Sequence, residues 1–394
     1  MSRSQTHAVA AGHVFDGAVL QPGAAVVVDG AQIVSVVPRS QLPAGMSIRE
    51  LPDGTWIAPG FVDLQVNGGA DVLFNDEPTA AGIAAIAAAH RKFGTTSLLP
   101  TLISDTPAKM KAALEAVDAS ADLQPSVLGL HLEGPFISPL KAGIHDPRFI
   151  REPTPDDESV LCRPRKGKLL ITLAPEAVPP GFIRRLAHAG VRVSLGHSMA
   201  TYAQTKAAMA DGLTGFTHLF NAMRPLASRD PGPIAAALES TDAWYGLIAD
   251  GVHVDPAILR LAVRGAGHAM LVTDAMPPVG GRRSSFVLHG QEIRVERGRA
   301  TNAEGTLGGA ILTMADAVRN CVELAEAALT DALKFASLHP AKFMGLGDRL
   351  GRLAPGYRAD IVAFEPASLN VLETWVAGAP SDRSAGLVAR AGGI

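Results

Sequence analysis

The sequence predicts a (β/α)8 barrel with a small β-sandwich built from both ends of the chain. From about residue 58 to residue 347, short apolar runs alternate with helical stretches, which is typical of β-α units around a parallel sheet. Eight such runs can be counted, the strand number of this barrel. Both ends instead show short β-type runs separated by Gly turns. We therefore expect a barrel domain at residues 58–348 and a sandwich domain at residues 1–57 and 349–394.

The two chain ends have the pattern of β-hairpins. The first 57 residues hold apolar runs at Ala8 to Phe15, Ala24 to Val28 and Ile33 to Val37, separated by the turn pairs Asp16-Gly17 and Asp29-Gly30. Residues 352–365 return to a Gly turn and a strand whose apolar centre is Ile361-Val362-Ala363-Phe364. These β-rich ends would pack most economically against each other beside the barrel.

The barrel strands are expected at eight apolar runs. They are Phe61 to Val66, Thr96 to Thr101, Val127 to Leu132, Leu169 to Leu173, Val191 to Leu195, Gly215 to Thr217, Tyr245 to Ala249, and Ala269 to Thr273. Helices are expected between them, among others at Thr79 to Phe93, Pro107 to Asp118, Ala200 to Asp211 and Asp255 to Arg264.

The pattern changes after the eighth run. Residues 285–300 read as a β-hairpin that turns at His289-Gly290, which suggests an insertion or a lid rather than a helix. Helical patterns then resume at Leu312 to Ala327 and at Asp331 to Phe343.

Composition excludes several classes of protein. Apolar residues make up 47% of the 394 residues and charged residues 19%, which indicates a globular chain. A net charge of −3 gives no general attraction for a polyanion, so no nucleic-acid partner is expected. The N-terminus lacks the apolar stretch of a secretory signal, and no segment reaches the roughly 18 apolar residues that span a bilayer. We expect a cytoplasmic protein without membrane attachment.

The cysteine and histidine content indicates which kind of metal site is available. Only Cys162 and Cys321 are present, so neither a disulfide framework nor a Cys-rich zinc site can form. Twelve histidines remain, and any metal should be held by imidazole and carboxylate groups.

Ionisable side chains follow five of the predicted strands. In such barrels the chemistry lies just past the carboxyl ends of the strands. A single histidine there would usually be structural, but five coincident placements indicate a site. The residues concerned are Glu133 in the segment His131 to Pro135, His197, His218, His253 and Asp274.

Three of these residues form a plausible ligand set for a metal ion. Glu133, His197 and His218 supply one carboxylate and two imidazoles, which leaves a catalytic Zn²⁺ with a fourth position for water. Such an ion makes the bound water a nucleophile and polarises an oxygen of the substrate. Asp274 is a further carboxylate that could take the proton of the water and pass it to a leaving group. These residues predict metal-assisted hydrolysis.

Seven phrases at these positions make a family resemblance specific. They are HLEGPF (131–136), KAGIHDP (141–147), GHSMAT (196–201), THLFNAM (217–223), ADGVHVDP (249–256), VTDAMPP (272–278) and GTLGGA (305–310). In this order they resemble the N-acetylglucosamine-6-phosphate deacetylases of the amidohydrolase superfamily, from about residue 8 to residue 366. The resemblance implies hydrolysis of the acetamide of N-acetyl-D-glucosamine 6-phosphate to D-glucosamine 6-phosphate and acetate, in amino-sugar catabolism.

The resemblance also implies roles for individual residues. The metal ligands of the family fall on Glu133, His197 and His218, its catalytic aspartate on Asp274, and the imidazole that polarises the amide carbonyl on His145. The arginine that serves the phosphate falls on Arg229 and reaches it across a dimer interface, so a homodimer is expected; without the resemblance, Arg229 would be read as a solvated loop charge. The substrate contacts fall on Ile144, His145, Asn221, Ala222, Arg229, His253, Leu307, Gly308 and Gly309.

The first predicted strand departs from many members of the superfamily. Those members place two histidines there to hold a second metal, whereas this chain has Gln65-Val66-Asn67. Amide side chains are poor zinc ligands, so we expect one divalent ion per chain, Zn²⁺ in preference to Fe²⁺ or Mn²⁺. Gln65 could contact the water of this ion, although some relatives with this fold carry two metals.

The sequence leaves three alternatives open. The substrate could be another N-acetylhexosamine 6-phosphate, because the orientation of one hydroxyl depends on loop geometry. A cyclic-amide hydrolase or a deaminase would usually keep the first-strand histidine pair, often with a carbamylated lysine on the fourth strand, and the fourth run here ends in residues 172–176 without a lysine. A catalytically inactive barrel used as a binding protein should have lost a ligand or Asp274, and none is missing.

Overall fold

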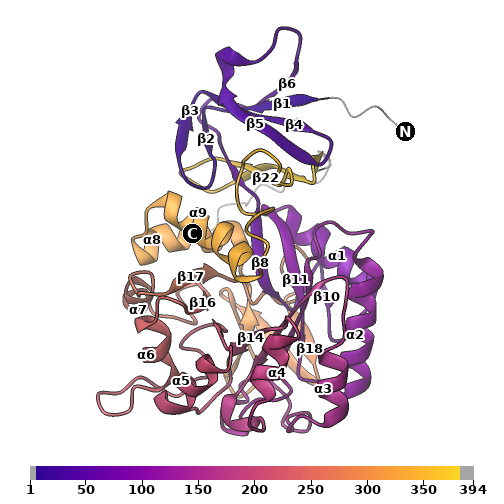
Figure 1. Ribbon diagram of the computed structural model, residues 1–394, viewed down its shortest axis with the longest axis vertical. Helices are drawn as coiled ribbons and strands as arrows, with labels where there is room; N and C mark the ends of the chain where they lie inside the picture. Colours follow the sequence, from indigo (N-terminus) through magenta and orange to yellow (C-terminus); the bar gives the residue numbers. More distant parts are fainter. Residues whose placement is uncertain (1–5, 382–394) are drawn as a thin grey trace.

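The eight predicted strands form one parallel sheet in chain order (Figure 1). This computed structural model describes residues 6–381. A parallel bridge between Val66 and Ala275 brings the end of the last strand back to the first, so the sheet is a nearly closed barrel and the predicted fold class is confirmed. The strands are β8 (Phe61–Val66), β11 (Thr95–Ile103), β12 (Gly129–Glu133), β13 (Lys168–Leu173), β14 (Arg192–Leu195), β15 (Gly215–Phe216), β16 (Trp244–Leu247) and β17 (His268–Leu271).

Helices connect successive barrel strands and cover the outside of the sheet. Thr79, Thr106 and Thr201 each accept a hydrogen bond from a backbone N–H of the first turn, which explains why helices begin at these threonines. The helices are α1 (Ala80–Arg91), α2 (Pro107–Ser120), α3 (Pro155–Leu161), α4 (Phe182–His188), α5 (Tyr202–Ala210), α6 (Gly232–Glu239), α7 (Pro256–Ala262) and α8 (Met314–Ala325). Short 3₁₀ turns occur at Arg39–Gln41, Pro139–Lys141 and Pro175–Ala177.

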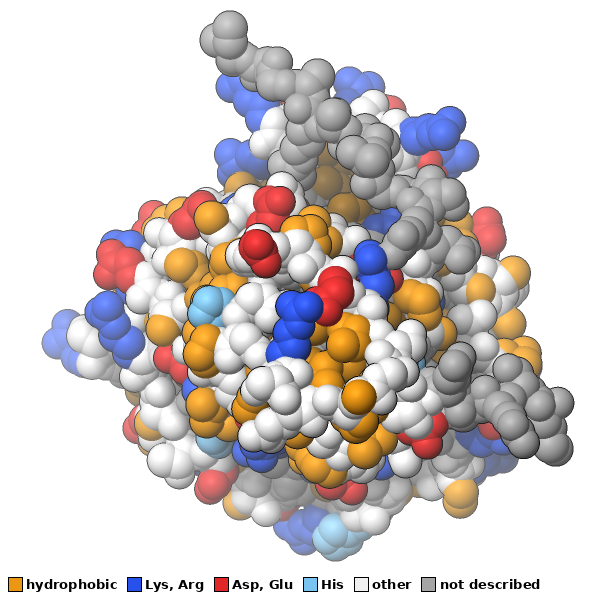
Figure 2. Space-filling model, turned by 90° about the horizontal axis from the view of Figure 1, so that it is seen from above, with side chains coloured by type: hydrophobic (Ala, Val, Ile, Leu, Met, Phe, Trp, Pro, Cys, Tyr) orange, Lys and Arg blue, Asp and Glu red, His pale blue; other side chains and the backbone are white. Residues whose placement is uncertain are grey.

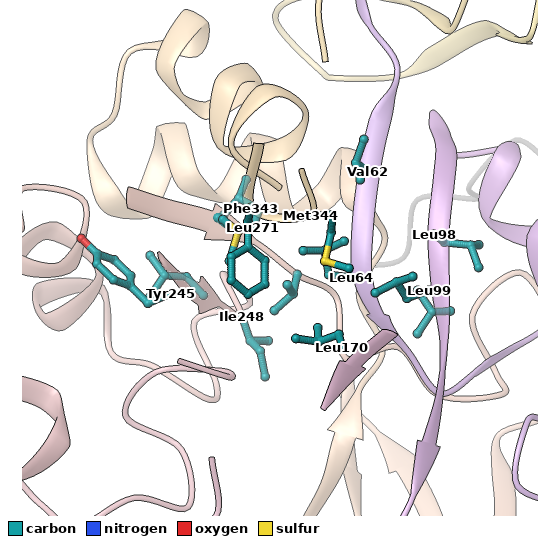
Figure 3. Close-up of a cluster of buried hydrophobic side chains, with 14 of the residues drawn as sticks. Val62, Leu64, Leu98, Leu99, Leu170, Tyr245, Ile248, Leu271, Phe343 and Met344 are labelled. Atoms are coloured by element: carbon teal, nitrogen blue, oxygen red, sulfur yellow. The ribbon is translucent and has the colours of Figure 1, made fainter. Parts of the chain in front are cut away.

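Apolar side chains fill the barrel and its surroundings. Leu64, Leu98 and Leu170 come from three of the barrel strands, and Figure 3 shows Phe343 and Met344 packed near Leu64. All five are at most 4% exposed. A close-packed interior of this kind resists deformation, so the ends of the strands are held in fixed positions.

A small β unit lies above the barrel in Figure 1 and joins both chain ends. One sheet has the order β5-β4-β1-β6 and the other the order β24-β23-β22-β7-β2-β3. Val9 and Val26 of the first sheet share a buried cluster with Ile57, Ile361 and Trp375 of the second. The strands are β1 (His7–Ala10), β2 (His13–Phe15), β3 (Leu20–Pro22), β4 (Ala24–Asp29), β5 (Gln32–Pro38), β6 (Ser47–Glu50), β7 (Trp56–Pro59), β22 (Ile361–Phe364), β23 (Val371–Val376) and β24 (Ala379–Pro380).

The domain boundaries at 57/58 and 348/349 remain predictions. The first falls inside β7, which pairs with β22 from the other end of the chain. Residues 1–5 and 382–394 of the predicted sandwich domain lie outside the described residues.

Two element predictions are wrong. The run from Ala8 to Phe15 forms two strands in different sheets, and the chain crosses between them at Gly12, where a Cβ atom would lie 3.2 Å from the backbone nitrogen of Gly54. The helix expected from Asp331 to Phe343 is split into α9 (Leu329–Ala336) and α10 (Leu338–Phe343). Pro340 explains the break, because a proline ring clashes with the carbonyl group four residues earlier in a continuous helix.

The segment after the eighth barrel strand forms a four-stranded antiparallel sheet, here named the lid sheet (residues 285–310). Leu288 pairs with Gln291 around the predicted turn at His289-Gly290. Phe286 and Ile293 of this sheet pack against Ile103 and Met276 of the barrel. The strands are β18 (Ser285–Leu288), β19 (Gln291–Glu296), β20 (Arg299–Thr301) and β21 (Leu307–Ala310), and a further short hairpin comprises β9 (Gly68–Gly69) and β10 (Val72–Leu73).

The surface carries charges of both signs. On the face shown in Figure 2, basic and acidic side chains lie interspersed with apolar ones. Within residues 6–381, no helix combines the length and apolar character needed to cross a bilayer.

Candidate active site

The ionisable side chains predicted after five barrel strands meet in one cavity of about 330 Å³ at the carboxyl ends of the strands, here named the active-site cavity. Glu133 is the last residue of β12, and His197, His218 and Asp274 follow β14, β15 and β17 by two or three residues. The sequence-predicted residues that line the cavity are Glu133, Ile144, His145, His197, His218, Asn221, Ala222, His253, Asp274, Leu307 and Gly309.

Two predicted substrate contacts do not line the cavity. Gly308 is buried behind it, where a Cβ atom would lie 3.4 Å from Cγ1 of Ile144. Arg229 is exposed on the loop before α6, and its neighbour Asp230 pairs with Arg224 instead. Within a single chain, the side chain of Arg229 therefore lies outside the cavity, whereas both neighbours of Gly308 line it.

Three ligand-type atoms converge at the floor of the cavity. Nε2 of His218 lies 2.8 Å from Oε1 of Glu133, and Nε2 of His197 lies 3.2 Å from the same oxygen. The two Nε2 atoms are 3.1 Å apart, and all three side chains are buried. Ligands at the usual Zn–N and Zn–O distances of about 2.0–2.1 Å in a tetrahedral shell are about 3.4 Å apart. The three atoms thus have the spacing of ligands around one small divalent ion.

The orientation of His197 suits a metal ligand. Its Nδ1 donates to the backbone oxygen of Lys141 at 2.8 Å, so its Nε2 presents a lone pair to Glu133 and His218. The loop that follows is held by Ser198, whose hydroxyl donates to Glu176 at 2.7 Å. Oε1 of Glu133 and Nε2 of His197 lie 3.2 Å apart, and neither atom carries a proton. This arrangement fits a divalent cation bound between them.

Left-handed backbone places several of these side chains. His197, His218 and Asp274 have φ angles of 49°, 31° and 50°, in a region that L-residues rarely adopt. Strained backbone of this kind is concentrated at functional sites, where the surrounding structure holds it in place. Here it turns the chain sharply just past each strand.

Asp274 is held by two amide side chains from β8 and the residue after it. Its Oδ1 accepts a hydrogen bond from Nδ2 of Asn67 at 2.6 Å and another from Nε2 of Gln65 at 3.1 Å. Nε2 of Gln65 also donates to Oε1 of Glu133 at 3.0 Å. Burial raises the pKa of Asp274 to about 6, and the negative charge of Glu133 adds to this rise. Asp274 is thus able to exchange a proton near neutral pH.

His145 has a defined tautomer. The backbone N–H of Ser104 donates to its Nδ1 at 3.4 Å, and the hydroxyl of Ser104 lies 2.8 Å from the same nitrogen. The ring proton is therefore on Nε2, which lies 4.0 Å from Oε2 of Glu133. Burial, together with the nearby His197, lowers the pKa of His145 well below its usual value, so the ring is a neutral donor.

His253 is oriented by an acidic neighbour. Its Nδ1 donates to Oδ2 of Asp250 at 2.6 Å, and Oδ1 of Asp250 accepts the backbone N–H groups of Val252 and His253. Burial raises the pKa of Asp250, but the hydrogen bond and charge of His253 and the two backbone donors together outweigh burial and leave this pKa below its usual value. Nε2 of His253 remains available for a ligand.

His131, which the sequence places two residues before Glu133, lies below the cavity. Its Nε2 is 2.7 Å from the hydroxyl of Thr172, and its Nδ1 is 3.3 Å from that of Thr101. Burial lowers the pKa of His131 to about 4, so the ring is neutral. It belongs to the polar interior of the barrel.

Asn67 and Ser104 are site residues that sequence reasoning missed. In the sequence, Asn67 stands out only as part of the amide pair that replaces two histidines, and Ser104 carries no motif signal. Ser104 stands three residues after the predicted strand that ends at Thr101, and this nearness to a strand end is the one signal that could have drawn attention to it.

Comparison with known proteins extends this description. A profile of the amidohydrolase family matches residues 56–389. N-acetylgalactosamine-6-phosphate deacetylase from Shewanella sp. (strain ANA-3) is 40% identical over 331 residues, 83% of this chain and 83% of the relative. N-acetylglucosamine-6-phosphate deacetylase from Haemophilus influenzae is 36% identical over 347 residues, 87% of this chain and 91% of the relative. The crystal structure of N-acetylglucosamine-6-phosphate deacetylase from Pasteurella multocida is similar with a TM-score of 0.91 and 34% identity, covering 95% of this chain and 99% of that one.

Proposed function

Because the chain belongs to the amidohydrolase family, and within it to the group of N-acetylglucosamine- and N-acetylgalactosamine-6-phosphate deacetylases, we propose that it hydrolyses the acetamide of N-acetyl-D-glucosamine 6-phosphate. The products are D-glucosamine 6-phosphate and acetate, and the pathway is amino-sugar catabolism. The observation that carries the proposal is the buried cluster of Glu133, His197 and His218 beside Asp274 in one cavity. Acetate release from N-acetylglucosamine 6-phosphate tests it, and absence of release from every N-acetylhexosamine 6-phosphate would refute it.

The cluster is proposed to hold one divalent ion, Zn²⁺ in preference to Fe²⁺ or Mn²⁺, through Glu133, His197 and His218. When bound, such an ion lowers the pKa of a water ligand and polarises a carbonyl oxygen. Gln65 and Asn67 stand where a histidine pair would hold a second metal. Their NH₂ groups point at carboxylate oxygens, and an NH₂ group cannot ligate a metal, which supports a single ion.

Asp274 is proposed as general base and then general acid. Its Oδ1 is occupied by the two amide donors, so Oδ2 is the oxygen that takes a proton from the attacking water. The protonated carboxyl then donates to the nitrogen of the scissile bond, which would otherwise leave as a poor leaving group. A pKa of about 6 suits both directions of transfer near neutral pH.

His145 is proposed to stabilise the carbonyl oxygen during attack. Ser104 fixes the proton of the ring on Nε2, and the neutral ring can donate this proton in a hydrogen bond as negative charge develops on the oxygen. The donor is already oriented before the substrate arrives, so no reorganisation is needed during the reaction.

The chain is proposed to form a homodimer in which Arg229 of one subunit binds the phosphate of the substrate held by the other subunit. The residues that line the active-site cavity in the described chain include no lysine or arginine, and a phosphate is best held by a guanidinium group. Arg229 is exposed on a loop with the exposed apolar residue Leu226, which is suited to contact another protein surface. His253, Asn221, Ala222 and the segment 307–309 are proposed to hold the rest of the sugar phosphate.

A second candidate substrate is N-acetyl-D-galactosamine 6-phosphate. The Shewanella relative, named for that epimer, is 40% identical to this chain, compared with 36% for the Haemophilus relative named for the glucosamine epimer. Acetate release measured side by side on the glucosamine, galactosamine and mannosamine epimers distinguishes these substrates. A cytoplasmic location is part of the proposal, and the two unpaired cysteines Cys162 and Cys321 are compatible with it.

A further inference from the structure

Asn67 carries a buried acceptor that the chain does not satisfy. Its side chain lines the active-site cavity and is 1% exposed. Among residues 6–381, no hydrogen-bond donor reaches its Oδ1. A buried acceptor without a partner is costly and rare in native proteins, so it calls for an explanation, of which a catalytic role is one.

The direction of this acceptor is fixed. The Nδ2 of Asn67 donates to Oδ1 of Asp274 at 2.6 Å, and a carboxylate oxygen can only accept from it. The backbone is held on both sides, since its N–H donates to Ala275 and its oxygen accepts from Phe74, each at 2.9 Å. The amide cannot turn over without losing the bond to Asp274, so Oδ1 remains the atom without a donor.

We propose that Oδ1 of Asn67 accepts the N–H of the scissile acetamide and thereby selects amides over esters. This assignment rests on the proposed function. Asp274 must lie within reach of the leaving nitrogen to protonate it, and Asn67 is bonded directly to Asp274. The N–H is the one donor of an acetamide group, because its carbonyl oxygen accepts and its methyl group does neither.

An ester reverses the interaction at this position. The bridging oxygen of an O-acetyl group carries lone pairs and no hydrogen, so it would face Oδ1 of Asn67 with acceptor against acceptor. A site that is built to bind a substrate N–H rejects the analogue that lacks it, because its buried polar group stays unpaired. Asn67 would then be a specificity-determining residue for the class of bond that is cleaved.

The test compares an amide with an ester in wild-type and variant holoenzymes. The substrates are N-acetylglucosamine 6-phosphate and 2-O-acetylglucose 6-phosphate, and the variants are Asn67→Ala and Gln65→Ala. Both variants remove one amide donor from the same oxygen of Asp274, so Gln65→Ala controls for effects on that carboxylate. We expect the ratio of kcat/KM for amide over ester to fall about 10- to 100-fold in Asn67→Ala and to change less than about twofold in Gln65→Ala. An unchanged ratio in Asn67→Ala, or an equal fall in both variants, would overturn the assignment.

Binding provides a readout that does not need turnover. Glucosamine 6-phosphate keeps an N–H at C2, whereas 2-deoxyglucose 6-phosphate has no donor there. Calorimetry should show that Asn67→Ala, or Asn67→Ser if the alanine variant does not fold, binds the amine about tenfold more weakly and the deoxy sugar as tightly as wild type. An equal loss of binding affinity for both ligands would overturn the assignment. If wild type releases no acetate, the proposed function fails; if wild type is active and the ratios do not move, only the role of Asn67 fails.

Discussion

Three histidines of the active-site cavity are each fixed through the ring nitrogen that faces away from it. His197 donates to Lys141, His145 accepts from Ser104, and His253 donates to Asp250. Each contact determines whether the other nitrogen carries a lone pair or a proton. At the scale of single residues, the chemistry of the cavity is therefore set by neighbours that need not touch a substrate.

Replacing Asp274 by asparagine should remove proton transfer while leaving the shape of the cavity. Asparagine has the same volume but cannot carry a proton between water and the leaving nitrogen, so kcat should fall about 10²- to 10⁴-fold. Metal content, measured on the purified variant, should match that of wild type. A variant that keeps most of its turnover would exclude Asp274 as the base.

Replacing Asp63 by asparagine should change how stability depends on pH. Burial raises the pKa of Asp63 to about 7 from 3.8, although Thr273 donates to its Oδ2. Folded Asp63 therefore keeps its proton when the unfolded chain has lost it, and wild type loses stability as pH rises from about 4 to 7.

Asparagine at position 63 resembles the protonated acid and does not titrate. Asp63→Asn should gain stability over wild type as pH rises, by up to about 4 kcal/mol above pH 7, because each pKa unit corresponds to about 1.4 kcal/mol. Urea unfolding of both proteins at pH 5 and pH 8 measures this difference. A difference that is the same at both pH values would contradict the raised pKa.

The sequence could identify those site residues that are recognisable by their position directly after a barrel strand. Glu133, His197, His218 and Asp274 follow parallel strands, and the carboxyl ends of such strands meet at one end of a barrel. The metal and catalytic roles of these residues remain predictions. Asn67 could not be recognised in the same way, because its importance lies in which of its two amide atoms is left without a partner.

At the scale of elements, the lid sheet connects the lining of the active-site cavity to the loop after β11. Its strand β21 supplies Leu307 and Gly309 to the cavity lining, and its turn residue His289 donates to Oδ2 of Asp105 at 3.2 Å. Burial raises the pKa of Asp105, but the hydrogen bond from His289 and other donors outweigh burial and hold this pKa at about 2. This contact fixes the far end of the sheet to the loop after β11.

Replacing His289 by asparagine should loosen the lid sheet. Asparagine tolerates the left-handed φ of 49° at this turn, so the turn persists while the contact with Asp105 is lost. Amide hydrogen exchange in residues 285–310 should become faster, and KM should rise about three- to tenfold with kcat nearly unchanged. Exchange as slow as in wild type would show that the contact does not hold the sheet.

The sequence predicted most elements but not all their ends. All eight barrel strands were found, because buried parallel strands read as apolar runs. The break before α10 was missed because the apolar pattern continues through it, although Pro340 was visible. The crossing at Gly12 was missed because a strand that changes sheets keeps the alternation of a single strand.

At the scale of the whole molecule, metal content tests the single-ion proposal. Purified protein should contain close to one divalent ion per chain, and a chelator should lower its melting temperature because the ion binds only the folded chain. Re-addition of one equivalent of Zn²⁺ should restore both stability and turnover. Two tightly bound ions per chain would contradict the role assigned to Gln65 and Asn67.

Arg229→Ala tests the homodimer. If Arg229 holds the phosphate, the variant should lose kcat/KM for the phosphorylated substrate about 100-fold, since charge-assisted hydrogen bonds are the strong ones. Activity on unphosphorylated N-acetylglucosamine should change little. Sedimentation of the active enzyme should give a dimer, and a fully active monomer would rule out a contact across two chains.

The junction between the β unit and the barrel has a consequence for the order in which the site can form during synthesis. Only Gly60 separates β7 from β8, and β8 leads directly to Asn67. β7 pairs on one side with β2, which precedes it in the chain, and on the other with β22, whose Val362 pairs with Ala58. A ribosome has already synthesised every residue of the cavity lining, and α8, α9 and α10 as well, before it makes β22. The strand β7, which leads into the strand of Gln65, is thus paired on both sides only at the end of synthesis, so we expect the nascent chain to become fully active only once β22 has emerged.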